Sequence, residues 1–177
     1  MKNAIFTSYV AFTLFATAFG TYKATNWQIS KDYAVNFVGT DVEGSFATLG
    51  GDIAFDESNL ASSKFSVRID ANSINTGNGM KNKHAKSDKW FDAEKFPSIS
   101  FTASKFSKTA SGFEAEGILD LHGVKKTMTI PFTFSNNVFK GSFSVNRLDY
   151  GVGNMEGMSK KVSNEIKLDI SVPVTKK

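Results

Sequence analysis

Apolar and polar residues alternate one by one through most of this sequence, and this period of two restricts the possible folds more than any other feature. A β-strand points successive side chains to opposite faces, so an alternating stretch predicts a strand with one apolar and one polar face. Antiparallel sheets are built from such strands. The pattern is complete over residues 64–71, 98–104, 112–123, 127–135, 139–146 and 164–174.

Shorter strands are expected earlier in the chain, at residues 33–37, 42–46 and 52–56, with an edge piece around residues 27–29. Turn-like residues separate the strands at Gly50–Gly51, 110–112 and Asn136–Asn137. So many strands in one small domain must close into a barrel or pack as a sandwich to protect their edges. Glycines in phase with the inward residues favour the barrel, because they either bend a strand at a corner or leave room inside; these are Gly44, Gly117 and Gly141.

One segment, residues 79–96, breaks the alternation with lysines, a histidine and three large aromatic residues. Residues 79–88 favour a helix, because they contain no β-branched side chain and include good helix formers. Asn78, just before them, can cap its N-terminus. The helix has almost no apolar face of its own. We therefore expect it at the surface, held by Met80 before it and by Trp90 and Phe91 after it.

The N-terminal residues predict export. Residues 3–22 carry no charge after Lys2, and Ala16–Thr17–Ala18 has the small-residue pattern of a cleavage site. We expect a signal peptide at residues 1–18 and a single domain at residues 19–177. A membrane anchor is the alternative, since the uncharged run is long enough to span a bilayer, but threonines dilute it.

Motifs that carry chemistry are scarce. The absence of cysteine excludes disulfides, thiol nucleophiles and thiolate metal sites. The two histidines, His84 and His122, lack a second ligand at metal spacing, and the usual serine-nucleophile motifs are missing. We expect no catalytic residue, no metal and no cofactor. The net charge of +4 does not indicate nucleic-acid binding and favours only weak contact with an anionic membrane surface.

Four ordered blocks of sequence indicate a family. They are His84 with Ser87–Asp88 and Phe91; Phe96–Pro97 with Ile99 and Phe101; Leu119 with Leu121–His122–Gly123–Val124 and Lys126; and Asn146–Arg147 with Asp149–Tyr150–Gly151. On these blocks the chain resembles the YceI-like family of exported bacterial lipid-binding proteins, from about residue 27 to residue 174. It departs from the usual family pattern at Lys81–Asn82, Ala85 and Trp90.

The resemblance implies an all-β fold: an antiparallel, eight-stranded, lipocalin-like barrel with one short helix at the mouth. It also implies a periplasmic protein that binds or carries one long amphiphile, such as an isoprenoid quinone, a polyprenyl phosphate or a fatty-acyl chain. An eight-stranded barrel is just wide enough to be filled by side chains or to hold one small ligand. The resemblance favours the hollow form.

The residues expected to line the tunnel are the inward positions of the strands and the aromatic residues of the mouth: Val35, Phe37, Phe46, Ile53, Phe55, Phe65, Val67, Ile69, Trp90, Phe91, Phe101, Phe113, Leu119, Phe132 and Phe143. We expect residues 75–96 to form the mouth, with the lysines of the helix turned outward and the aromatic residues from Trp90 to Phe96 turned into the barrel. The alternative is that Trp90, Phe91 and Phe96 only fill the core. The candidates for contact with the head group of the ligand are Lys81, His84 and Arg147.

Two other functions are compatible with the sequence. One is an enzyme that acts on such a lipid, with His84 or His122 as the acid–base group and a nearby aspartate as its partner. The other is a barrel with a filled core that serves in assembly or stress protection. We expect a binding protein and not an enzyme, either monomeric or a homodimer.

N-terminal sequencing of the exported product tests the cleavage site. We expect the mature chain to begin near Phe19, because the apolar run ends at the Ala16–Thr17–Ala18 pattern. A product in the membrane fraction that keeps Met1 would contradict this prediction and favour the anchor.

Overall fold

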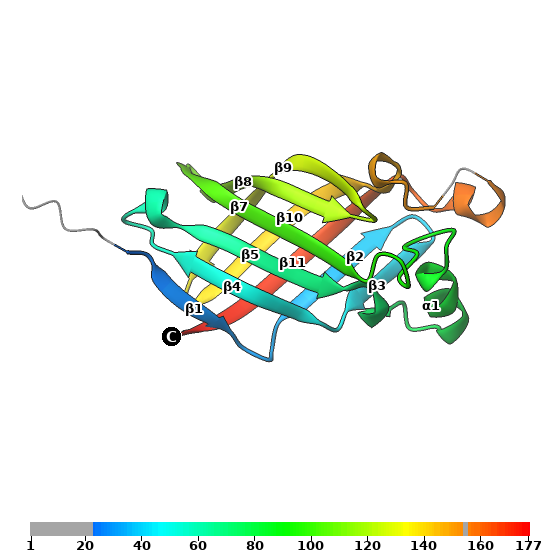
Figure 1. Cartoon of the computed structure of the whole chain (residues 1–177), viewed down its shortest axis with the longest axis horizontal. Helices are drawn as coiled ribbons and strands as arrows, with labels where there is room; N and C mark the ends of the chain where they lie inside the picture. The colour runs from blue at the N-terminus through cyan, green and yellow to red at the C-terminus, as the bar shows by residue number, and fades with distance from the viewer. Residues whose placement is uncertain (1–22, 154–155) are drawn as a thin grey trace, which may run out of the picture.

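The computed structural model describes residues 23–153 and 156–177, so the predicted signal peptide at residues 1–18 lies outside the described residues. A single antiparallel sheet of 11 strands forms the molecule (Figure 1). The strands are β1 (Thr25–Ile29), β2 (Ala34–Gly39), β3 (Val42–Phe46), β4 (Leu49–Phe55), β5 (Lys64–Asp70), β6 (Ile74–Asn75), β7 (Ser98–Thr109), β8 (Gly112–Leu121), β9 (Val124–Ser135), β10 (Val138–Asn146) and β11 (Glu165–Lys176).

The strands form an eight-stranded barrel, because three of the barrel strands are each interrupted once. β1 and β2 both pair with β11, and their other edges pair with β4 and β3 respectively. β5 and β6 continue the same arrangement, since they pair with β4 and β3. The pairing of β1 with β11 closes the ring. The structure confirms the predicted antiparallel barrel with a short helix.

The three interruptions lie next to one another and are joined by hydrogen bonds from side chains. The Tyr33 hydroxyl donates to the carbonyl oxygen of Ala47 at 2.8 Å and accepts from the amide of Leu49 at 3.0 Å. The hydroxyl of Ser73, in the 3-10 helix η2 (Ala71–Ser73), accepts from the amide of Thr48, and its carbonyl accepts from Ala47. The wall therefore stays connected where its regular ladder is broken.

Two expectations about strand boundaries are wrong. Gly50–Gly51, predicted as a turn, lies inside β4 and pairs with β5. At Gly51 the backbone φ is +126°, and a Cβ atom would overlap the carbonyl oxygen of Ser66 on β5. Glycine serves here to let the two backbones approach, and not to form a turn. β1, predicted as an edge piece, pairs on both sides and closes the barrel.

The predicted helix is present as α1 (Gly79–Lys86). The Asn78 side chain caps it by accepting hydrogen bonds from the amides of Met80 and Lys81, both at 3.0 Å. Met80 does not hold the helix as expected, because its side chain is 72% exposed. Ala85 and Phe91 make the apolar contact instead, and the Phe91 ring lies edge-on to Phe46 at 5.9 Å.

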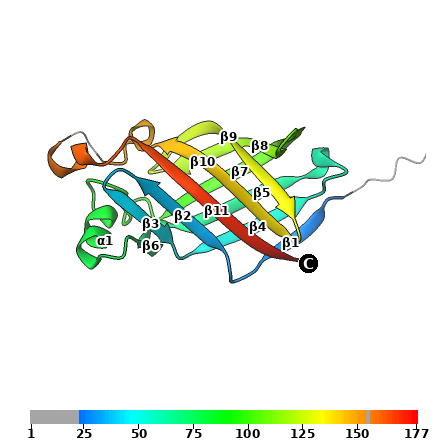
Figure 2. The same ribbon diagram turned by 180° about the vertical axis from the view of Figure 1, so that it is seen from behind.

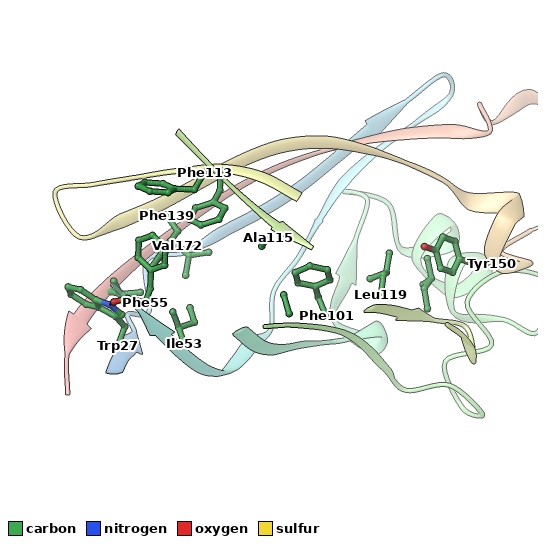
Figure 3. Packing of buried hydrophobic residues seen from close by; sticks show 14 of the residues in the cluster. Trp27, Ile53, Phe55, Phe101, Phe113, Ala115, Leu119, Phe139, Tyr150 and Val172 are labelled. Atoms are coloured by element: carbon green, nitrogen blue, oxygen red, sulfur yellow. The ribbon is translucent and has the colours of Figure 1, made fainter. Parts of the chain in front are cut away.

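Aromatic rings fill one end of the barrel. Phe55 is only 1% exposed and lies at the centre of this group. Its ring centroid lies 5.2 to 6.3 Å from those of Phe65, Phe106, Phe113, Phe132, Phe134 and Phe139. Trp27 donates its indole N–H to the carbonyl of Phe55 at 3.1 Å and packs edge-on against Phe134. We call these eight residues the aromatic plug; Figure 3 shows Trp27, Phe55, Phe113 and Phe139 grouped together, away from Tyr150.

The helix α1 and the longest connection lie at the opposite end, which we call the mouth. Residues 40–41 join β2 to β3, α1 lies between β6 and β7, and the turn His122–Gly123 joins β8 to β9. Residues 147–164, with the 3-10 helices η3 (Arg147–Tyr150) and η4 (Gly157–Lys161), join β10 to β11. Figures 1 and 2 show α1 and this last connection at the end away from the C-terminus. In the described part of the chain, no helix is long and apolar enough to cross a membrane.

Substituting Phe55→Ala should lower the free energy of unfolding by about 3–5 kcal/mol, because the plug would lose the ring at its centre. Ile118→Ala is the control, since Ile118 is 42% exposed on the outer face of β8, and we expect a change within roughly 0.5 kcal/mol. Urea denaturation followed by circular dichroism measures both. Equal losses would show that the plug does not carry the stability of the barrel.

Candidate functional site

A cavity of about 930 Å³ occupies the half of the barrel that faces the mouth. This volume is near the upper end of the range of about 300–1,000 Å³ that is common for small-molecule sites. Phe65, Phe132 and Phe139 of the aromatic plug are part of its lining, so the plug forms the floor. The barrel is therefore filled at one end and hollow at the other.

The cavity wall is made of inward side chains from strands all around the barrel. Of the residues predicted to line it, all lie on the wall except Phe55 and Phe113. The alternation also holds across neighbouring positions: Val67 and Phe143 line the cavity, whereas Ser66 and Ser144 are exposed. Further apolar lining residues carry the same inward phase and could have been identified from it, namely Ile99, Ile166, Leu168 and Ile170.

The predicted lining is wrong at Phe55 and Phe113, which do not reach the cavity. Both are buried and point inward, but their rings pack against each other at 5.2 Å within the plug. Phe96 was also expected to turn into the barrel, and that prediction is wrong. Its ring lies against His122 at 4.7 Å, and a Cβ atom on the neighbouring Gly123 would meet it at 2.6 Å. Phe96 thus packs against the β8–β9 turn.

Most charged residues of the lining come from the segments that form the mouth, while Arg68 on β5 and Lys140 on β10 add two from the strands. Lys81 and His84 lie on α1 and Lys161 lies on η4, while Asp41 and Glu43 come from the β2–β3 hairpin. All five side chains are solvent-exposed. An amphiphile with its chain in the cavity would therefore meet charges of both signs at its polar end. The acidic pair and Lys161 were missed, because no local pattern distinguishes them from ordinary surface residues.

Arg147 is 3% exposed although its side chain is cationic. Its guanidinium donates to backbone carbonyl oxygens of Val152 at 2.8 Å, Ser159 and Ser163 at 3.0 Å, and Val162 at 3.2 Å. Burial lowers the pKa of the Arg147 guanidinium from its ordinary value, yet arginine stays charged in proteins. Arg147 therefore fastens the β10–β11 connection to the end of β10.

Trp90 covers the Arg147 guanidinium at the cavity wall. The guanidinium carbon lies 5.1 Å from the centre of the Trp90 ring, a distance at which a cation and an aromatic face attract each other. Gly153 completes this layer, because a Cβ atom there would lie 2.6 Å from Nη1 of Arg147 and 2.9 Å from Trp90. The layer joins the segment after α1 to the β10–β11 connection across the mouth.

The two histidines differ in position. His84 is exposed at the rim of the cavity. His122 lies 3.1 Å from the carbonyl oxygen of Tyr150 through Nδ1, while its buried Nε2 has no hydrogen-bond partner in the described part of the chain. This contact ties the β8–β9 turn to η3. Among residues 23–153 and 156–177, the structure has no group of three or more His, Asp or Glu residues that could hold a metal ion.

Comparison with known sequences identifies relatives. The YceI-like domain family matches residues 11–174. The chain is 36% identical over 94 residues to a UPF0312 protein of Vibrio vulnificus (strain YJ016), and this alignment covers 52% of the chain and 50% of that relative. It is 32% identical over 143 residues to a UPF0312 protein of Vibrio campbellii, covering 76% of this chain and 75% of the relative. The chain thus spans about half the length of the first relative.

Solved structures share the fold. BcnA from Burkholderia cenocepacia superposes with a TM-score of 0.76 at 25% identity, over 84% of this chain and 99% of BcnA. A polyisoprenoid binding domain from Saccharophagus degradans superposes with a TM-score of 0.62, over 88% of this chain and 100% of that domain. At 17% identity, this second likeness shows the fold alone.

Arg147→Met should lower the free energy of unfolding by about 3–5 kcal/mol, because it leaves buried carbonyl groups without their charged donor. Arg68→Met removes the same kind of side chain from an exposed position on β5 that also borders the cavity, so it serves as the control for stability alone and should change it by no more than roughly 0.5 kcal/mol. Urea denaturation compares the two variants. If Arg147→Met left stability unchanged and weakened only ligand binding, Arg147 would serve the head group instead of the fold.

Proposed function

The chain belongs to the YceI-like family, and we propose that it is an exported protein that binds or carries a long amphiphilic lipid with its chain inside the barrel. The observation that carries this proposal is the apolar cavity of about 930 Å³, closed by the aromatic plug and lined with charges at its mouth. Such a site matches a molecule with a long hydrocarbon chain and one polar end. Isoprenoid quinones, polyprenyl phosphates and fatty acids have this form.

Burial of the chain supplies the affinity. At about 0.8 kcal/mol per methylene, roughly 15 buried methylenes contribute about 12 kcal/mol before costs. Loss of translational and rotational freedom opposes this by about 4–15 kcal/mol. The net affinity therefore depends on how completely the chain fills the cavity. This dependence favours ligands long enough to reach from the mouth to Phe132 and Phe139 on the floor.

The orientation of the ligand follows from the polarity of the two ends. The plug is aromatic and presents no charge to the chain, whereas Lys81, His84 and Lys161 lie at the rim. Placing a charged head among aromatic rings without a partner would cost several kcal/mol. The head group therefore lies at the mouth. Arg147 contributes mainly by holding the β10–β11 connection, through its bonds to backbone carbonyls.

Two further observations support a lipid ligand without catalysis. The Saccharophagus degradans domain of the same fold is a polyisoprenoid binding domain. An acid–base pair would need two titratable groups within hydrogen-bond reach of the reacting atoms. His122 instead lies against Phe96 and the Tyr150 carbonyl, outside the cavity lining. Export and a periplasmic location belong to the proposal and rest on the signal in residues 1–18.

Extraction of the purified protein with organic solvent, followed by mass spectrometry, tests the proposal. We expect a prenyl or fatty-acyl lipid in roughly equimolar amount, because the cavity has room for one chain. Delipidated protein should then bind a long-chain quinone or a fluorescent fatty acid. A protein that yields no lipid and binds neither probe would contradict the proposed function.

Val67→Asp should abolish lipid retention, because an unpaired charge in the apolar wall costs several kcal/mol. Ser66→Asp is the matched control on the exposed face of the same strand, and we expect it to retain lipid. Val67→Trp adds a variant that fills the cavity without charge and should also reduce binding. Circular dichroism confirms folding, and mass spectrometry measures bound lipid. Full retention in folded Val67→Asp and Val67→Trp would place the ligand elsewhere.

A further inference from the structure

The barrel wall is incompletely paired between β9 and β10. These strands pair only from Ser135 and Val138 to Phe132 and Gly141. Beyond that point β9 continues along β8 to Val124, and β10 continues along β11 to Asn146. Over residues 124–131 and 142–146, each strand is thus paired on one edge only. These parts run toward the mouth, so the unpaired stretch of wall, which we call the slit, begins at the mouth and ends beside Phe132.

Pro131 explains why the pairing stops. Ser135 and Val138 flank the two-residue turn Asn136–Asn137, so they form a hydrogen-bonded pair. Counting back from Ser135 along β9, every second residue points its amide toward β10. Pro131 is in this phase, but it has no N–H to donate. The pairing of Pro131 with Glu114 on β8 is kept, because its missing donor faces the other way.

The length of the slit suits a hydrocarbon chain. At about 3.3 Å per residue, the free edge of β10 beyond Gly141 runs for roughly 17 Å, and that of β9 for roughly 26 Å. Ile130, Phe143 and Val145 line the cavity from the two edges. Thr129 and Ser144 point outward and are small, exposed hydroxyl residues. The slit therefore has polar side chains on its outer face and apolar cavity-lining side chains on its inner face.

We propose that this slit is a lateral entrance through which the hydrocarbon chain of the ligand passes sideways into the cavity, while its head group stays at the mouth. The inference rests on the proposed function. End-on entry would require a long chain to be threaded past α1 and the Arg147–Trp90 layer toward a closed floor. Lateral entry avoids this, because the slit is continuous with the mouth.

Cross-linking of the slit tests the entrance. If the register of β9 and β10 continued past Phe132 and Gly141, Thr129 would lie opposite Ser144. Thr129→Cys with Ser144→Cys, joined by a cleavable bis-thiol reagent, would close the slit. Because the chain has no cysteine of its own, only the introduced thiols react. The matched control is Ser66→Cys with Thr102→Cys, which lie opposite each other on the fully paired β5–β7 ladder.

Stopped-flow uptake of a fluorescent long-chain fatty acid by the delipidated protein gives the readout. Closure of the slit should slow both uptake and release by about tenfold or more, and cleavage of the reagent should restore both rates, as for a gate that limits exchange. The cross-linked control should keep the wild-type rates. Unchanged rates in the closed variant, with binding intact, would overturn the entrance while leaving the proposed function in place. Failure of the wild-type protein to bind the probe at all would overturn both.

Pro131→Thr provides a test without cross-linking. Threonine restores the amide donor, so the β9–β10 ladder should extend toward the mouth and exchange of the probe should slow. Amide hydrogen exchange measures the ladder directly, through added protection at Thr129, Ser142 and Ser144, whose amides face the opposite strand in this register. Added protection with unchanged uptake would contradict the lateral entrance.

Discussion

The packing of aromatic rings around Phe55 is the interaction on which the rest of the structure depends. Phe55 contacts rings from five other strands of the barrel, and its backbone carbonyl accepts the indole N–H of Trp27 on the strand that closes the ring. Aromatic side chains bury large areas without needing polar partners, so one end of the barrel can be filled completely. Once that end is filled, any ligand must reach the interior from the mouth half. The helix, the charged rim and the long β10–β11 connection all lie there.

The interruptions in the first three barrel strands lie within the cavity wall, since β4 and β5 on one side of them and β2 and β3 on the other all contribute lining residues. β1 and β2, β3 and β4, and β5 and β6 are each separated by a short interruption. There the hydroxyls of Tyr33 and Ser73 bond to backbone groups of residues 47–49, in place of backbone partners from a neighbouring strand. These bonds keep backbone groups satisfied while the strands change direction, which a continuous ladder would resist. The wall therefore stays connected around the cavity, while the plug fills the other end of the same sheet.

The sequence predicted which face of each strand points inward, because alternation is a local property. It also predicted the helix and its Asn78 cap, which depend on neighbouring residues. It did not reveal how deep an inward residue lies along the barrel axis, so Phe55 and Phe113 were assigned to the cavity instead of the plug. Gly50–Gly51 was read as a turn, since local sequence does not show the close approach of β5. The sequence does not show that the β10–β11 connection folds back so that its carbonyl groups surround Arg147, and it therefore predicts a head-group role for this residue.

Pro131 shows how a closed barrel can admit a long ligand at small cost. A hydrogen bond in a ladder contributes only about 1 kcal/mol net, so the donor that Pro131 lacks costs little, and each further bond that β9 and β10 do not form toward the mouth is of the same small size. The same residue placed one position earlier or later would point its missing donor toward β8 and interrupt a ladder that is paired from Phe113 to Leu121. The edges left free are also protected against pairing with other chains, since proline and lysine on an edge strand disfavour such contacts, and β9 carries Lys125 and Lys126 beside the slit. One proline in the correct phase therefore keeps β9 paired with β8 and ends its pairing with β10, so the wall stays intact on one side of the strand and leaves an entrance on the other.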